Sequence, residues 1–260
     1  MGRLTFQVSG TTHKGLRKKE NQDSIIVKIG EDAKGEFGLF AIADGVSTMA
    51  GSKNASHYMI KTLEEFWYFD LPYSIKRKDS FNELMEKLRH KIKQGHQTIL
   101  KQETLKQGTT LTVLLIKQKE SGIIHIGDTR LYQYANQTMT QVTQDHTYVN
   151  DLVKQKIITP LESKKHPKRH IITQCIGGKE AIHLEVIPKK VTGEELFLIC
   201  SDGLYDEVEE ETLSSVLKDI ETSQITIKKG VHTLLQEVLK KEAKDNISII
   251  IVKVKKGRAV

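Results

Sequence analysis

The apolar residues of this chain fall mostly into short runs separated by polar turns. Ser24-Ile25-Ile26-Val27 is rich in β-branched residues, which favours a strand. The run 38–43 is apolar throughout, which is typical of a strand buried on both faces. From such patterns we expect strands at 5–9, 23–29, 38–43, 109–116, 122–126, 131–134, 139–142, 183–187, 196–200 and 247–254.

Helical periodicity is clearest in two long stretches. In 54–69 the apolar residues recur every fourth position, which places them on one helix face, with Ser52 or Asn54 as a candidate cap. The second stretch, 81–105, carries a similar stripe. Further helices are expected at 147–154, from Pro160 onward, at 209–217 and at 228–243.

The order of these elements points to a fold class. Strands, helices, strands, helices and a closing strand follow one another, which is not the regular alternation of a parallel sheet. The short loops between the strands from 109 to 142 favour antiparallel pairing. We therefore predict an α+β fold, an antiparallel sheet or sandwich with helices outside, in which 145–178 is the most irregular stretch.

Composition indicates a globular protein. The chain has 260 residues, 38% hydrophobic and 28% charged, with 4 Pro and 18 scattered Gly, so we expect one domain over 1–260. The net charge of +7 is dispersed, without aromatic residues between the basic ones, so we expect a solvated tail at 255–260 and no nucleic-acid binding. No stretch approaches the ~18 apolar residues of a membrane helix and no signal-peptide core is present, so we expect no membrane insertion and a cytoplasmic location. Cys175 and Cys200 are expected to be buried, reduced thiols.

Three acidic residues stand at the ends of predicted strands. Asp44-Gly45 follows the run 38–43, and Asp202-Gly203 follows a second apolar run. Asp245 lies just before the closing strand. A single Asp-Gly pair is commonly only a turn, but two after strands and a third acid before one form a narrower pattern.

Acids in these positions suit hard cations. The sheet fixes their backbone, and a neighbouring glycine such as Gly45 lets a carbonyl approach an ion. Mg²⁺ and Mn²⁺ prefer oxygen ligands and retain waters, and two such ions about 3.5–4 Å apart can share a carboxylate and a water that attacks phosphorus. Zinc is disfavoured because no C-x-x-C or H-E-x-x-H occurs, and no Walker A sequence is present.

With these motifs in order, the sequence resembles the bacterial form of the metal-dependent serine/threonine protein phosphatases of type 2C. The resemblance covers about 6–254 and rests on eight ordered motifs. They are Asn21-Gln22-Asp23, Ala43-Asp44-Gly45, Gln107-Gly108-Thr109-Thr110, Gly127-Asp128-Thr129-Arg130, Thr143-Gln144-Asp145-His146, His166-Pro167 with 172–177, Ser201-Asp202-Gly203-Leu204 and Asp245-Asn246-Ile247-Ser248.

The resemblance implies a role for each acid. Asp44 would bridge two Mn²⁺ or Mg²⁺ ions, Gly45 would offer its carbonyl to one, and Asp202 and Asp245 would bind the other. Asp23 would support the first ion through water, and Asp128 would help to hold a possible third ion. Residues 146–175 would form a flap that shapes substrate access, with His146 expected on its surface. The implied fold is a pair of antiparallel sheets flanked by helices on both outer faces, in α-β-β-α layers.

The sequence also departs from the family pattern. Lys18 stands where the family has its phosphate-binding arginine, with Arg17 one position earlier, so either could bind phosphate. Gln22 replaces an acid, and Val46 stands where some members carry a histidine that acts as general acid.

Together these features predict an enzyme. A hydroxide bridging two Mn²⁺ or Mg²⁺ ions would hydrolyse phosphoserine and phosphothreonine in proteins, and the substrates would be products of a serine/threonine kinase. The alternative is a pseudophosphatase, a regulatory binding module of the same fold with little catalysis. A third reading is a hydrolase of small phosphoesters.

Overall fold

Two five-stranded sheets form the centre of the computed structural model, which describes residues 3–49, 51–102 and 107–257. All neighbouring strands within each sheet pair antiparallel. The first sheet has the order β1 (Leu4–His13), β10 (Ile247–Lys256), β9 (Leu196–Cys200), β6 (Arg130–Ala135) and β7 (Thr138–Gln141). The second has the order β2 (Ser24–Asp32), β3 (Gly35–Ala43), β4 (Leu111–Lys117), β5 (Glu120–Ile126) and β8 (Glu185–Lys190).

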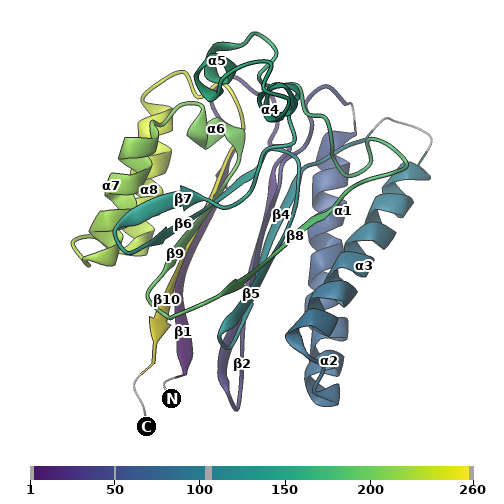
Figure 1. The fold of residues 1–260 in the computed structure, drawn as a ribbon, viewed down its shortest axis with the longest axis vertical. Helices are drawn as coiled ribbons and strands as arrows, with labels where there is room; N and C mark the ends of the chain where they lie inside the picture. The colour runs from purple at the N-terminus through teal and green to yellow at the C-terminus, as the bar shows by residue number, and fades with distance from the viewer. Residues whose placement is uncertain (1–2, 50, 103–106, 258–260) are drawn as a thin grey trace.

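Helices cover both outer faces of the sandwich (Figure 1). The second sheet is covered by α1 (Ser52–Glu65), α2 (Leu71–Arg77) and α3 (Phe81–Leu100), and the first by α7 (Glu210–Glu221) and α8 (Ile227–Leu239). Three apolar clusters correspond to these layers: one lies between the sheets and one lies under each set of helices. The predicted α+β sandwich with α-β-β-α layers is confirmed.

Strand β3 illustrates why the central strands are apolar on both faces. Phe40 and Ile42 point between the sheets, whereas Leu39 and Ala41 pack under the helices. All four are fully buried. A strand covered on both faces has no solvated side, so its sequence is continuously apolar up to Asp44.

The helix expected at 54–69 is longer than predicted. α1 passes through a π-helical turn (Phe66–Asp70) into α2, and Leu71 N–H bonds to the carbonyl of Phe66. Pro72 stands in the first turn of α2, directly after the π-helical turn. Neither predicted cap is used, because Gly51 is the N-cap and the Ser52 hydroxyl instead donates to the Val46 and Met49 carbonyls.

The remaining elements agree with the sequence apart from their ends. The expectation of a solvated tail at 255–260 is wrong at its start, because β10 continues to Lys256 and pairs there with β1; residues 258–260 lie outside the described residues. α3 begins at the expected Phe81 with a capping box on Ser80, but ends at Leu100; residues 103–105 of the predicted helix lie outside the described residues. A four-residue helix, α6 (Asp202–Tyr205), follows β9 directly and was not expected. In the described residues, no helix has the length and apolar character needed to cross a membrane. Both cysteines are buried free thiols.

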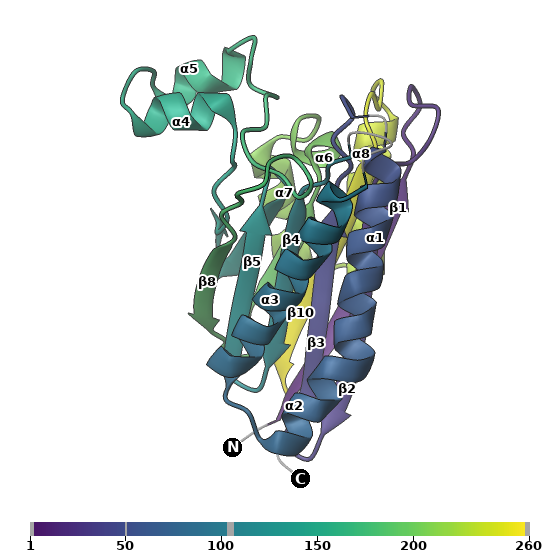
Figure 2. The ribbon, with the colours of Figure 1, turned by 90° about the vertical axis from the view of Figure 1, so that its right-hand side faces the viewer.

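The irregular segment stands away from the sandwich. It carries α4 (Tyr148–Lys154) and α5 (Pro160–Lys165), with Thr147 and Thr159 as their N-caps. Figure 2 shows this pair projecting beyond the ends of the strands, on the side opposite to the chain termini. We keep the name flap for residues 146–175.

Candidate metal centre

Five aspartates converge on the rim of the sandwich that faces the flap. Each stands just before or just after a strand. Antiparallel pairing brings the end of one strand beside the start of its neighbour, so these positions lie at the same edge of the sandwich. Hydrogen bonds join the segments that carry these acids: the Ser201 and Ser248 hydroxyls donate to Asp23, and the Thr110 hydroxyl accepts the Asp44 N–H and bonds with the Thr129 hydroxyl. This acid rim consists of Asp23 before β2, Asp44 after β3, Asp128 after β5, Asp202 after β9 and Asp245 before β10.

The two residues directly before β4, Thr109 and Thr110, hold the Asp44 backbone at the rim. The Asp44 carbonyl accepts the Thr110 N–H at 2.8 Å and the Thr109 hydroxyl at 2.9 Å, and the Asp44 N–H donates to the Thr110 hydroxyl at 3.1 Å. Burial, followed by the charges of the other four acids, raises the Asp44 pKa well above its usual value. A β-carbon on Gly45 would lie 2.8 Å from the Gln22 carbonyl, so the backbone here needs glycine.

Asp23 is held from one side only. Its Oδ2 accepts hydrogen bonds from the Ser248 hydroxyl at 2.7 Å and the Ser201 hydroxyl at 3.0 Å. Its Oδ1 is buried without a hydrogen-bond partner among the described residues. Burial raises the Asp23 pKa to about 6. An ionised carboxylate with one buried free oxygen fits a cation, directly or through a water.

The ionised forms of Asp202 and Asp128 are also disfavoured, and their pKa values are raised. Burial, then the charges of Asp128 and Asp245, raises the Asp202 pKa well above its usual value. Burial, then the charge of Asp145, raises the Asp128 pKa to about 7. Like charges in a desolvated site favour protonation or cation binding. The all-oxygen donor set of the rim suits Mg²⁺ or Mn²⁺ better than zinc.

Close backbone approach fixes the two strand ends that carry Asp202 and Asp245. A β-carbon on Gly203 would lie 2.0 Å from the Asn246 carbonyl oxygen. The Asn246 side chain donates to the Lys14 and Glu20 carbonyls and accepts the Gln22 N–H. Asn246 therefore ties the loop that carries Lys18 to the start of β10.

The two candidate phosphate ligands differ in position. Lys18 Nζ lies 2.7 Å from Asp245 Oδ1, at the edge of the acid rim, and its side chain is 27% exposed. Arg17 points to Glu242 at 3.7 Å and is 67% exposed. Lys18 is thus the cation that the structure brings to the acids, while Arg17 lies on the surface beside them. Val46 follows Gly45 after β3 and donates its N–H to the Gly108 carbonyl, and its aliphatic side chain offers no acid.

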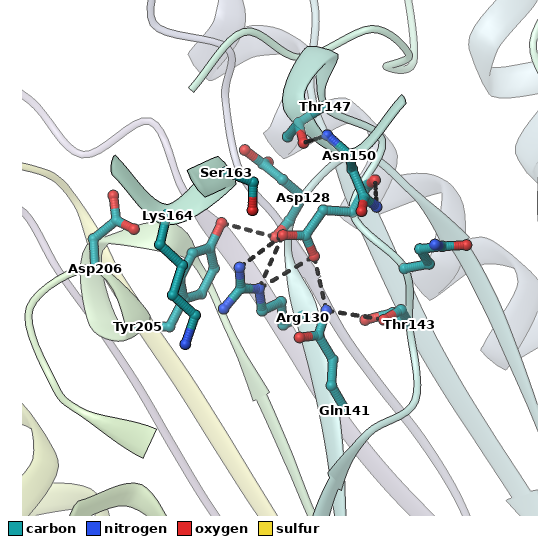
Figure 3. A network of polar contacts seen from close by, with 12 residues as sticks. Asp128, Arg130, Gln141, Thr143, Thr147, Asn150, Ser163, Lys164, Tyr205 and Asp206 are labelled. Carbon is teal, nitrogen blue, oxygen red and sulfur yellow. Dashed lines mark hydrogen bonds and ion pairs between the residues drawn. The ribbon is translucent and has the colours of Figure 1, made fainter. Parts of the chain in front are cut away.

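The flap joins the acid rim through a polar network (Figure 3). Arg130 donates two parallel hydrogen bonds to the Asp145 carboxylate, at 2.8 and 3.1 Å, and its guanidinium stacks 3.7 Å from the Tyr205 ring centroid. The Tyr205 hydroxyl donates to the Asp128 carbonyl at 3.1 Å. The sequence offers no signal for this role of Tyr205, because its partners lie far away along the chain.

The expectation that His146 lies on the flap surface is wrong. Its residue surface is only 8% exposed, and its Nδ1 accepts the Gly127 N–H at 3.0 Å. The His146 N–H donates in turn to the Gly127 carbonyl at 2.7 Å. Gly127 has a positive φ of 107° that favours glycine, so His146 clamps the turn that presents Asp128.

Comparisons with known proteins assign the family. A model described as "Protein phosphatase 2C" matches residues 10–240. The serine/threonine protein phosphatase PstP of Mycobacterium tuberculosis is 28% identical over 96% of this chain and 45% of its own length. Protein phosphatase PhpP of Streptococcus pneumoniae is 29% identical over 95% of this chain and 97% of its own. This chain belongs to the protein phosphatase 2C family.

A solved structure gives the same result for the fold. The catalytic domain of PstP in complex with two manganese ions superimposes with a TM-score of 0.78 at 27% identity, covering 97% of this chain and 99% of that one. The chain spans less than half the length of the complete PstP relative, although it spans nearly all of PhpP.

Proposed function

We propose that this protein is a metal-dependent phosphatase that hydrolyses phosphoserine and phosphothreonine in proteins. The observation that carries the proposal is the convergence of five aspartates on one rim, with the pKa values of four of them raised by burial. The relatives named as serine/threonine phosphatases, and the manganese bound to one of them, support the same reading.

Each acid has a distinct part in this proposal. Asp44 would be shared by two Mn²⁺ or Mg²⁺ ions, with the Gly45 carbonyl on one of them and Asp202 and Asp245 on the other. Asp23 would hold a water of the first ion through its free Oδ1, and Asp128 would contribute to a third ion. When bound, the ions would activate a water for attack on phosphorus and neutralise the charge that develops on the phosphoryl oxygens.

Residues of the loop before β2 would orient the phosphate. Lys18 would leave Asp245 and pair with phosphoryl oxygens as the substrate enters, which adds a charge-assisted contact without a bidentate grip. Arg17 would act from a greater distance. Because Val46 has no titratable group, the proton for the leaving serine or threonine oxygen would come from solvent or from another side chain. The substrates would be phosphoproteins made by a serine/threonine kinase.

The experiment is phosphate release from a phosphothreonine peptide with and without Mn²⁺, using Asp202→Asn as the matched control. We expect release that requires the metal and is lost in the variant. No release by the wild type with Mn²⁺ or Mg²⁺ would refute the enzyme. Calorimetric titration with Mn²⁺ then separates an inactive metal-binding protein from a pseudophosphatase without a metal site, although the complete set of acids argues against the latter.

A further inference from the structure

A cleft of about 880 Å³ lies between the flap and the segment that begins with α6. Its floor contains Asp128, Arg130 and Tyr205, the residues of the network in Figure 3. On one side it reaches Asp206, whose carboxylate lies within 4.8 Å of a carboxylate oxygen of Asp202. The cleft therefore opens directly onto the acid rim, where the phosphorylated residue of a substrate would be held.

The two walls of the cleft carry opposite charge. The flap wall consists of Lys164, Lys165, Arg169 and His170, and the shoulder wall consists of Asp206, Glu209 and Glu210. Two contacts cross the cleft: Lys164 Nζ lies 4.0 Å from Glu210 Oε1, and His170 Nδ1 lies 3.3 Å from Asp206 Oδ2.

The Lys164–Glu210 ion pair across the cleft can be replaced by another ion pair at little cost in free energy. The Lys164 and Glu210 side chains are 70% and 52% exposed, so solvent screens their attraction and replaces it when they separate. The floor behaves differently, because the Arg130 guanidinium is bonded to Asp145 and stacked on Tyr205. Arg130 is therefore already paired. A phosphorylated or acidic group that entered the cleft would lie near the acids of the shoulder wall, and Arg130 would not be free to bind it.

The shoulder wall has a fixed position relative to the reaction centre. Asp206 caps the end of α6, the helix that begins with Asp202, and Glu209 and Glu210 open α7 immediately afterwards. The flap wall belongs to a segment that projects from the sandwich (Figure 2). The carboxylates of the shoulder wall thus lie at set distances from the bound phosphoryl group, as a recognition surface requires.

We propose that this cleft binds the part of the substrate protein next to the phosphorylated residue, and that Asp206, Glu209 and Glu210 select segments carrying Lys or Arg. This inference rests on the proposed function and names its substrate class. A basic substrate side chain takes the place of Lys164 on Glu210, and the released Lys164 faces the bound segment. One exposed ion pair replaces another, so the opening of the cleft costs little free energy. An acidic segment could pair with the flap wall, but it would lie beside the three carboxylates of the shoulder wall, which hold fixed positions next to the reaction centre.

The test compares two phosphothreonine peptides that differ only in flanking Arg or Glu residues. For the wild type with Mn²⁺ we expect kcat/KM to be about tenfold higher for the Arg peptide. Glu210→Lys should abolish or invert this ratio. Glu211→Lys is the matched control, because Glu211 lies in the same first turn of α7 but does not line the cleft, and it should keep the wild-type ratio. Hydrolysis of p-nitrophenyl phosphate, which has no flanking residues, normalises each variant.

The outcomes separate this inference from the proposed function. Equal kcat/KM for the two peptides, or an equal change of the ratio in Glu211→Lys and Glu210→Lys, would overturn the cleft as a selective site. Absence of phosphate release from both peptides and from p-nitrophenyl phosphate in the wild type would instead overturn the proposed function. In that case fluorescence anisotropy with the same two labelled peptides still decides the inference: tighter binding of the Arg peptide, lost in Glu210→Lys, supports it, and equal binding overturns it.

Discussion

The acid rim and the neighbouring cleft arrange their charges in opposite ways. On the rim, five acids lie together, and burial raises the pKa values of four of them, Asp23, Asp44, Asp128 and Asp202. Across the cleft, exposed cations face exposed acids and pair with them. Apart from the pairing of Lys18 with Asp245, the ionised rim acids would be stabilised by cations from outside the chain, whereas two ion pairs within the chain join the walls of the cleft.

This difference separates two tasks. A site that must hold metal ions gains affinity from charges that are left uncompensated, at a cost in folding stability. A surface that must accept varied segments benefits from weak pairs that can be exchanged. We therefore expect substitutions on the rim to have large effects of opposite sign on stability and activity, and substitutions at the cleft to act on substrate choice alone.

The largest effect is expected for Asp44→Asn. Removing the central charge should lower Mn²⁺-dependent phosphate release by about a hundredfold to a thousandfold, because both ions lose the shared ligand. The same change should raise the melting temperature of the metal-free protein by about 5 °C, because it relieves repulsion among the buried acids. Differential scanning fluorimetry in EDTA measures the melting temperature, and a phosphate-release assay with Mn²⁺ measures the activity. A variant that loses both stability and activity would contradict the view that the rim is destabilised by its own charge.

The pH dependence of the metal-free protein sharpens the same comparison. The pKa values of Asp23 and Asp128 rise from the ordinary 3.8 to about 6 and about 7 in the folded chain. Between about pH 4 and pH 7 the folded state therefore holds protons that the unfolded state has released. The free energy of unfolding should fall as pH rises through this window, with the loss complete above the folded pKa values.

Denaturation by urea in EDTA, from pH 4.5 to 7.5, measures this slope. Saturating Mn²⁺ should flatten it, because the bound ions favour the ionised carboxylates and stabilise the folded state. Asp44→Asn should also reduce it, since one proton-binding group is gone. If the free energy of unfolding of the metal-free protein instead rises steadily with pH over this range, the pKa values of the rim acids are not raised in the folded state.

A smaller effect is expected at the edge of the rim. Lys18→Ala should lower kcat/KM for a phosphothreonine peptide by about tenfold to a hundredfold, the value of a hydrogen bond to a charged group. Lys18→Arg should retain most activity, and Arg17→Ala should change it by about twofold or less, because Arg17 is more exposed and paired with Glu242. Steady-state kinetics on the three variants decides between the two cations. A larger loss in Arg17→Ala than in Lys18→Ala would reverse the assignment.

The sequence predicts the rim much better than its surroundings. Asp44, Asp202 and Asp245 could be placed because each adjoins a continuous apolar strand, and strand ends in an antiparallel sandwich meet at one rim. The roles of His146 and Tyr205 could not be predicted, because each depends on a partner brought near by the fold: Gly127 for His146 and Asp128 for Tyr205. The sequence also shows no periodic pattern that predicts the π-helical turn after α1 or the four-residue helix α6.

The smallest effect is expected for the ion pair that spans the cleft. Lys164→Ala, Glu210→Ala and the double variant should each change the melting temperature by about 2 °C or less, because both side chains are largely exposed. A double-mutant cycle on thermal unfolding should accordingly give a coupling near zero, while the same cycle on peptide kcat/KM should give a clear coupling, since both residues contact the substrate segment. Strong coupling in stability would mean that the Lys164–Glu210 pair holds the flap closed. The ion pairs of the cleft would then not be freely replaceable, and the cleft would not differ from the rim in the way proposed.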